Sequence, residues 1–151
     1  MARRGVPSSG RPELREASLR VIAAGQAASG AFVASPTFSQ YRYAWIRDGA
    51  FVAEALDLVG ELERSARFHA WVAGIVLRSA DGLAQAIVRT RRGEPPSTDE
   101  YLHCRYGLDG SRSDGEWHTF QLDGPGIWLW AVAHHVRQGG GLTMGSVTPS
   151  V

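Results

Sequence analysis

The ten residues IWLWAVAHHV, from Ile127 to Val136, open with seven successive apolar side chains and decide the fold class. They follow DGPG, residues 123 to 126, which is typical of a turn before a helix. A helix that lacks a polar face is stable only when other elements bury it on all sides. The stretch therefore predicts an inner helix of an all-α protein.

Three further helices are predicted before this one. Residues 12 to 30 have a proline at the first turn and an apolar stripe opposite charges, which indicates an amphipathic helix. Residues 48 to 60 are apolar almost all round, between an aspartate suited to a helix start and a glycine suited to its end. Residues 61 to about 77 are again amphipathic.

This order of outer, inner, outer and inner helices is what a barrel of helical hairpins would produce. Two long loops, residues 30 to 47 and 78 to 122, lie at one end if successive helices run antiparallel, and long loops are usually functional. Four helices cannot close a barrel, so the apolar ones would expose a patch. Such a patch implies a partner, self-association or a missing remainder of the chain.

The chain divides accordingly into a Pro/Gly/Ser-rich leader, a helical domain and a Gly-rich irregular tail, over residues 1–11, 12–137 and 138–151. With 16 basic and 15 acidic residues its formal charge is +1, which predicts no nucleic-acid or membrane surface. No segment reaches the roughly 20 apolar residues of a membrane span, and no secretory signal is evident. We expect a cytoplasmic protein.

The two loops hold the ingredients of a sugar site. Sugars present hydroxyls at their edges and C–H groups on their faces, so they bind paired polar groups beside aromatic rings. Arg47 and Asp48 offer donors and acceptors, while Tyr41, Trp45 and Trp117 offer faces. An alternative remains open, in which the Arg–Asp pair only caps a helix and the tryptophans belong to the core.

No metal or cofactor site is predicted. His103, Cys104 and His118 lack the spacing of a structural zinc site. Cys104, the single cysteine, is expected to be a small packed residue. His134 and His135 are expected to be a core pair rather than catalysts.

Two segments resemble the glucoamylase-type enzymes of glycoside hydrolase family 15. YRYAWIRD, residues 41 to 48, resembles the signature Tyr-x-Tyr-x-Trp-x-Arg-Asp, and WHTFQLDGP, residues 117 to 125, resembles the pattern Trp-x-x-x-Gln-x-Asp-Gly-Pro. The resemblance covers roughly residues 14 to 137. It implies a partial (α/α)6 toroid, a barrel built in that family from six helical hairpins.

The resemblance also implies roles for the loop residues. Arg47 and Asp48 would bind hydroxyls of the terminal glucose of an α-glucoside or oligosaccharide, while Trp45 and Trp117 would pack against the ring. Tyr41 would lie near the reacting carbon and favour an oxocarbenium-like transition state. The resemblance assigns Gln121 and Asp123 to shaping the loop, and we interpret Trp128 and Trp130 as core residues.

The family's reaction is inverting hydrolysis of terminal glucosidic bonds, with one carboxylic acid and one carboxylate base. The family places both glutamates after the second motif, so they are expected beyond the end of this chain. The chain is then a fragment of a glucoamylase- or trehalase-like hydrolase and is inactive alone. Two alternatives are a non-catalytic sugar-binding protein and a helical interaction module.

Overall fold

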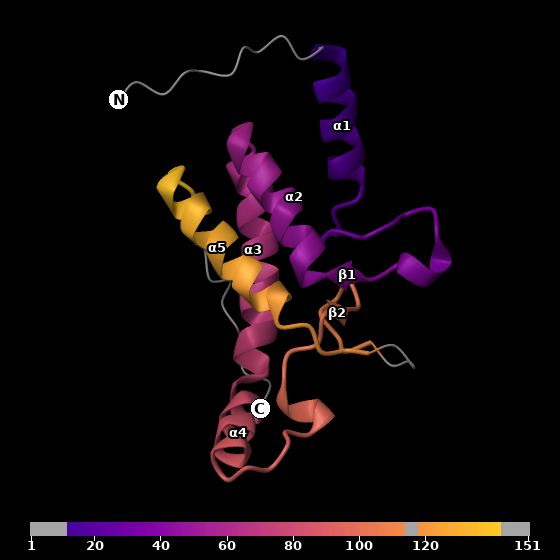
Figure 1. Cartoon of the computed structure of the whole chain (residues 1–151). Helices are drawn as coiled ribbons and strands as arrows, with labels where there is room; N and C mark the ends of the chain where they lie inside the picture. Colours follow the sequence, from indigo (N-terminus) through magenta and orange to yellow (C-terminus); the bar gives the residue numbers. More distant parts are fainter. Residues whose placement is uncertain (1–11, 114–117, 143–151) are drawn as a thin grey trace, which may run out of the picture.

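The computed structural model describes residues 12–113 and 118–142, and its elements are mainly helical (Figure 1). The helices are α1 (Pro12–Ala24), α2 (Ile46–Leu58), α3 (Leu62–Arg78), α4 (Ala80–Arg91) and α5 (Asp123–Arg137). Two 3-10 turns, η1 (Ser39–Tyr41) and η2 (Thr98–Glu100), and two short strands, β1 (Ala44–Trp45) and β2 (Arg105–Tyr106), lie in the loops. The predicted all-α class, as part of a helical toroid, is confirmed.

The boundaries differ from the sequence prediction most clearly at α1 and α4, while α2 begins and ends two residues earlier than expected. Helix α1 ends at Ala24, before the expected residue 30, because the chain turns at Gly25 and Gln26 pairs with Phe32. The prediction of one long loop over residues 78 to 122 is wrong, since residues 80–91 form α4. The Gly and Asp residues there favoured a loop, but Ala, Leu, Gln and Arg between them are good helix formers.

Helix α2 packs against both α3 and α5, and the three helices form the centre of the core (Figure 1). Gly49 makes this packing close, because a Cβ atom on it would lie 2.3 Å from a ring carbon of Phe68. The Phe68 ring is fully buried against the start of α2. The contact fixes the first turn of α2, which carries Arg47 and Asp48.

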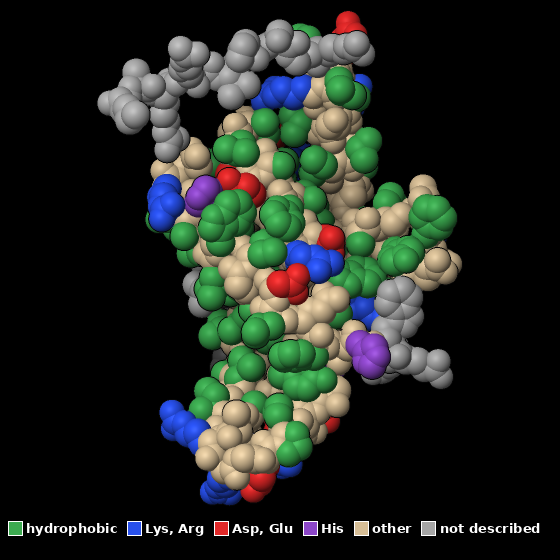
Figure 2. Space-filling view, in the orientation of Figure 1, with side chains coloured by type: hydrophobic (Ala, Val, Ile, Leu, Met, Phe, Trp, Pro, Cys, Tyr) green, Lys and Arg blue, Asp and Glu red, His purple; other side chains and the backbone are tan. Residues whose placement is uncertain are grey.

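Apolar side chains remain exposed over α2 and α5, as the sequence analysis predicted (Figure 2). Trp130 is 44% exposed and Phe51 52% exposed, with their rings 6.4 Å apart. The assignment of Trp130 to the core is therefore wrong, because nothing in the described residues covers this face, whereas Trp128 is half-buried against the core. Among the described helices none alone is long and apolar enough to cross a membrane; α3 and α4 reach that criterion only together, across a 57° bend.

Candidate functional site

The loop before α2 and the loop between α4 and α5 meet where α2 and α5 begin. Strands β1 and β2 pair in antiparallel register, with Trp45 opposite Arg105. Directly after this pair, the Ile46 amide donates to the Cys104 carbonyl at 3.2 Å. The expectation that both loops lie at one end of the helices is confirmed.

An ion pair joins the two sequence motifs. Arg47 Nη1, in the first turn of α2, donates to Asp123 Oδ2 at the start of α5 over 2.9 Å. This hydrogen bond raises the pKa of Arg47 and lowers the pKa of Asp123, so both groups are charged at neutral pH. A guanidinium has about five N–H donors, so one bond to Asp123 orients Arg47 without using all of them.

A pocket of about 360 Å³ opens beside this pair. Its described lining is Ala34, Tyr41, Trp45, Arg47, Asp48, Cys104, Arg105, His118 and Gln121. Four of the five predicted site residues thus line one pocket, while Trp117 lies outside the described residues. The volume is at the small end of the range for ligand sites, about 300–1,000 Å³, and suits a small polar molecule.

The aromatic wall of the pocket is held by Arg105, which the sequence analysis did not select. The rings of Tyr41 and Trp45 lie 5.9 Å apart, and Tyr43 meets Trp45 edge-on at 6.3 Å. The Arg105 guanidinium carbon lies 5.0 Å from the Tyr43 ring centre and 5.9 Å from that of Trp45. Arg105 is buried and donates to Ser113 Oγ at 2.9 Å, so these contacts fix the position of the Trp45 ring.

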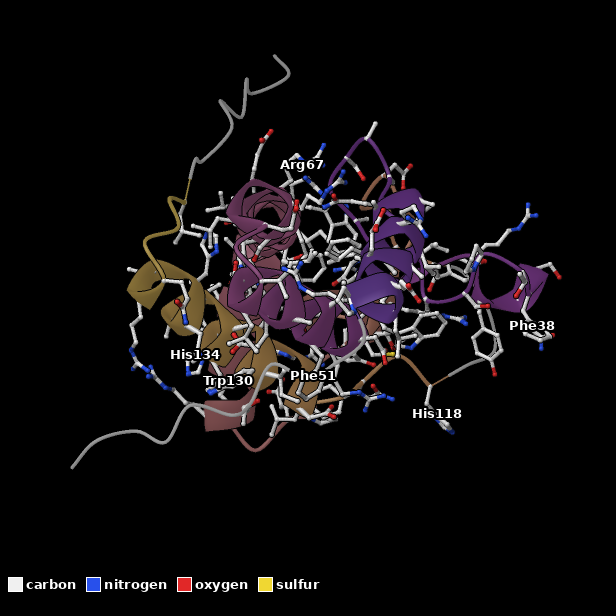
Figure 3. All side chains as sticks on the ribbon, turned by 90° about the horizontal axis from the view of Figure 1, so that it is seen from above. Phe38, Phe51, Arg67, His118, Trp130 and His134 are labelled. Carbon is white, nitrogen blue, oxygen red and sulfur yellow. The ribbon has the colours of Figure 1, made fainter. Side chains whose placement is uncertain are left out.

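Arg105 was missed because its aromatic partners, Tyr43 and Trp45, come from the other loop, and only a basic residue beside His and Tyr in HCRYG hinted at it. His118 and Gln121 join the lining from the same side. In Figure 3, His118 and Phe38 lie on the opposite side of the molecule from Trp130 and His134.

The alternative in which Asp48 caps a helix through a side-chain hydrogen bond is wrong. Helix α2 begins at Ile46, its N-cap residue is Trp45, and no side-chain hydrogen bond caps it. Asp48 lies in the first turn, where a negative charge interacts favourably with the helix dipole, and its side chain is exposed at the pocket. Trp45 is both 8% exposed and part of the lining, so it belongs to the core and to the pocket.

The family resemblance implies that this pocket binds a sugar, and on that expectation Asp123→Asn weakens the binding by up to about fivefold, because an amide orients Arg47 without a charge. Stability toward urea should hardly change, since the pair is partly exposed. The affinity is measured by calorimetry with glucose. Asp99→Asn, which alters a similar 2.9 Å pair with Arg112 outside the pocket lining, is the matched control and should leave affinity unchanged. Equal losses in both variants would contradict the assignment.

Cys104 is expected to react with a disulfide reagent at least about a hundredfold more slowly in the folded chain than in urea. It is 5% exposed, and burial raises the pKa of its thiol, which reduces the reactive thiolate. The rate at which the reagent releases its own thiol at pH 8 measures the reaction of Cys104. Cys104→Ser should give no signal in either state, and a folded rate equal to the unfolded rate would show that the thiol is accessible. Its predicted packed position is confirmed.

The chain combines a helical scaffold with a pocket that aromatic residues, Arg47 and Asp48 line. This combination is that of the helical-barrel glycosidases, which are the class of this protein. The profile of the glycosyl hydrolases family 15 matches residues 14–150. The chain therefore belongs to glycosyl hydrolases family 15. The match extends past Arg137, where the motif resemblance ended.

Known relatives agree with this membership. An isomaltose glucohydrolase from Kribbella flavida is 42% identical over 129 residues, which cover 85% of this chain and 34% of the relative. A glycosidase variant solved in complex with glucose has a TM-score of 0.78 and 41% identity, over 84% of this chain and 34% of that one. A wild-type glycosidase structure gives the same values. The chain spans about a third of the length of these relatives.

Proposed function

We propose that this chain forms the subsite for the terminal, non-reducing glucose of an α-glucoside in an inverting hydrolase. The observation that carries the proposal is the convergence of Tyr41, Trp45, Arg47 and Asp48 on one small pocket at the meeting point of two loops. A relative that is an isomaltose glucohydrolase and a similar structure that holds glucose support this substrate class.

Each side chain has a distinct role in the proposal. Asp48 accepts hydrogen bonds from neighbouring hydroxyls, and Arg47, oriented by Asp123, donates to them. Trp45 packs against the C–H face of the sugar, and the same role is proposed for Trp117, which lies outside the described residues. The Tyr41 oxygen lies near the reacting carbon and favours its positive charge in the transition state.

Inverting hydrolysis also needs a general acid and a general base, which transfer protons during the reaction. Inverting hydrolysis uses two carboxyl groups about 6.5–9.5 Å apart, and Asp48 is the single carboxylate in the described lining of the pocket. We propose that the general acid and base belong to segments that correspond to the remaining two thirds of the relatives' length. Without them the 151-residue chain binds the sugar and leaves its glycosidic bond intact.

The direct test is calorimetric titration of the purified chain, shown to be folded by circular dichroism, with glucose, isomaltose and maltose. We expect saturable binding near one sugar per chain, together with a change in tryptophan fluorescence from Trp45. Arg47→Ala should remove the heat. Arg20→Ala, at an exposed arginine on α1 that pairs with Glu16, is the control and should bind normally. A folded chain that gives no heat would contradict the proposal.

The exposed apolar face of α2 and α5 favours a second candidate, an interaction module that self-associates through Phe51 and Trp130. Sedimentation velocity at increasing concentration tests it. Under this candidate Phe51→Glu dissociates the oligomer, while Arg47→Ala leaves it intact. A monomer at every concentration would remove self-association from consideration.

A further inference from the structure

Tyr43, the second tyrosine of the segment YRYAWIRD, does not belong to the described lining of the sugar pocket. Its side chain is half-buried, and it directly precedes strand β1. Side chains alternate along a strand, so residues two apart point to the same side of it. Tyr43 is therefore placed to contact Trp45, which does line the pocket.

The alternation of side chains in the two strands separates the core from the pocket. Ala44 and Tyr106 lie opposite each other and belong to the main apolar cluster of the described core. Trp45 and Arg105, the neighbouring pair, point to the other face of the sheet. The adjacent hydrogen bond between the strands flanks this pair instead of joining it, an arrangement that brings opposite side chains closest together. The register therefore holds Arg105 beside Trp45.

Arg105 bridges two aromatic rings on this face. Tyr43 meets Trp45 nearly perpendicular, at an interplanar angle of 84° and a centroid distance of 6.3 Å. The Arg105 guanidinium carbon lies 5.0 Å from the Tyr43 ring centre and 5.9 Å from that of Trp45. Both distances are within the roughly 6 Å over which a guanidinium and an aromatic ring attract each other. Tyr43 and Arg105 thus contact the Trp45 ring and each other.

The guanidinium of Arg105 is itself fixed in position. Its residue is 4% exposed, and its Nε donates to Ser113 Oγ at 2.9 Å, where Ser113 is 6% exposed. A charge that has lost its water must gain compensating contacts, and its attraction to ring faces is stronger than at the surface. The contacts that keep Arg105 buried are therefore the same contacts that hold the two rings.

We propose that Tyr43 and Arg105 are positioning residues, which hold the Trp45 ring at the angle that a sugar face needs. This role rests on the proposed function, in which Trp45 packs against the terminal glucose. An indole ring that is free to rotate loses that freedom when a sugar binds, whereas a ring already fixed in the free protein does not. Tyr43 therefore increases the affinity for the sugar from outside the described pocket lining.

The first measurement follows the Trp45 ring in the absence of sugar. The five tryptophans of the 151-residue chain are replaced by fluorotryptophan, and the fluorine NMR signal that is missing from Trp45→Phe is assigned to Trp45. We expect Tyr43→Leu and Arg105→Met to shift and broaden this signal, because the ring gains alternative orientations. The signals of the tryptophans in α3 and α5 should keep their positions.

Tyr101→Leu is the matched control for Tyr43→Leu. Tyr101 is also a half-buried tyrosine, and it meets Phe120 edge-on at 85° and 5.1 Å, but it lies outside the described pocket lining and in the other loop. The substitution removes a similar ring contact without touching Trp45. It should leave both the Trp45 signal and the affinity for glucose unchanged.

The second measurement is the affinity for glucose by calorimetry. Tyr43→Leu and Arg105→Met should each weaken binding by about threefold to tenfold. The double variant should bind about as well as the weaker single variant, because the two side chains act on the same ring. Arg105→Lys keeps the charge but not the planar group, so its affinity should fall between those of the wild type and Arg105→Met.

The two measurements separate this proposal from the proposed function. An unchanged Trp45 signal in Tyr43→Leu would overturn the positioning of the ring, whatever the affinity. A changed signal with an unchanged affinity for glucose would overturn its importance for binding. If the wild-type chain binds no glucose, the proposed function fails and the role in sugar binding fails with it, while the fluorine signal still decides whether Tyr43 holds the ring. If Arg105→Met does not fold, Tyr43→Leu, a change at a half-buried site, decides alone.

Discussion

Gly30→Ala is expected to destabilise the chain by about 2–5 kcal/mol, the sum of backbone strain and a steric clash. Gly30 has φ +101°, which an L side chain rarely adopts. A Cβ atom at this position would also lie 2.3 Å from the backbone oxygen of Arg67 in α3. A backbone atom within a helix cannot rotate away, so the loop must leave α3. Urea unfolding followed by circular dichroism measures the loss.

Gly60 provides the matched control for Gly30. It also has a positive φ, +86°, in the turn between α2 and α3, but a Cβ atom there would meet nothing within 4 Å. Gly60→Ala should therefore show only the conformational cost, about 1–2 kcal/mol. The difference between the two variants isolates the contact with Arg67. Equal losses would mean that this contact does not determine the fit of the first loop.

Asp48→Ala is expected to lower kcat/KM for isomaltose by roughly a hundredfold to ten-thousandfold in a hydrolase that contains this chain. Under the proposed function, the substitution leaves substrate hydroxyls without their acceptor and Arg47 without the adjacent carboxylate. The enzyme for this test is a chimera, in which this chain replaces the matching third of the Kribbella flavida isomaltose glucohydrolase. Glucose release by the chimera measures the effect.

Asp81→Ala is the control for Asp48→Ala, because Asp81 also lies in the first turn of a helix, α4, but outside the described pocket lining. Both substitutions remove a favourable helix-dipole interaction, worth about 0.3–1 kcal/mol at exposed sites, and only Asp48→Ala removes a sugar ligand. Asp48→Asn, which keeps one acceptor oxygen, should fall between the wild type and Asp48→Ala. Activity that is unchanged in Asp48→Ala would refute the assignment.

The sequence predicted four of the nine described lining residues of the pocket, because these motif residues are close together in the chain. Tyr41, Trp45, Arg47 and Asp48 belong to eight successive residues, so wherever α2 begins they lie near one another. Arg105 and the role of Asp123 were not predictable in the same way. Their contacts join residues from different loops, and no local sequence pattern predicts which distant side chains will be in contact.

The same difference between local and long-range contacts applies to the helices. The apolar runs that form α2 and α5 determined both the helical class and the face that stays exposed, because hydrophobic periodicity acts over a few turns. Only the tertiary structure packed α2 against both α3 and α5, paired Arg47 with Asp123, and brought Asp57, His69 and His135 together. The physical reason is distance along the chain: local propensity acts between neighbours, whereas these contacts form when the burial of apolar faces brings distant helices together.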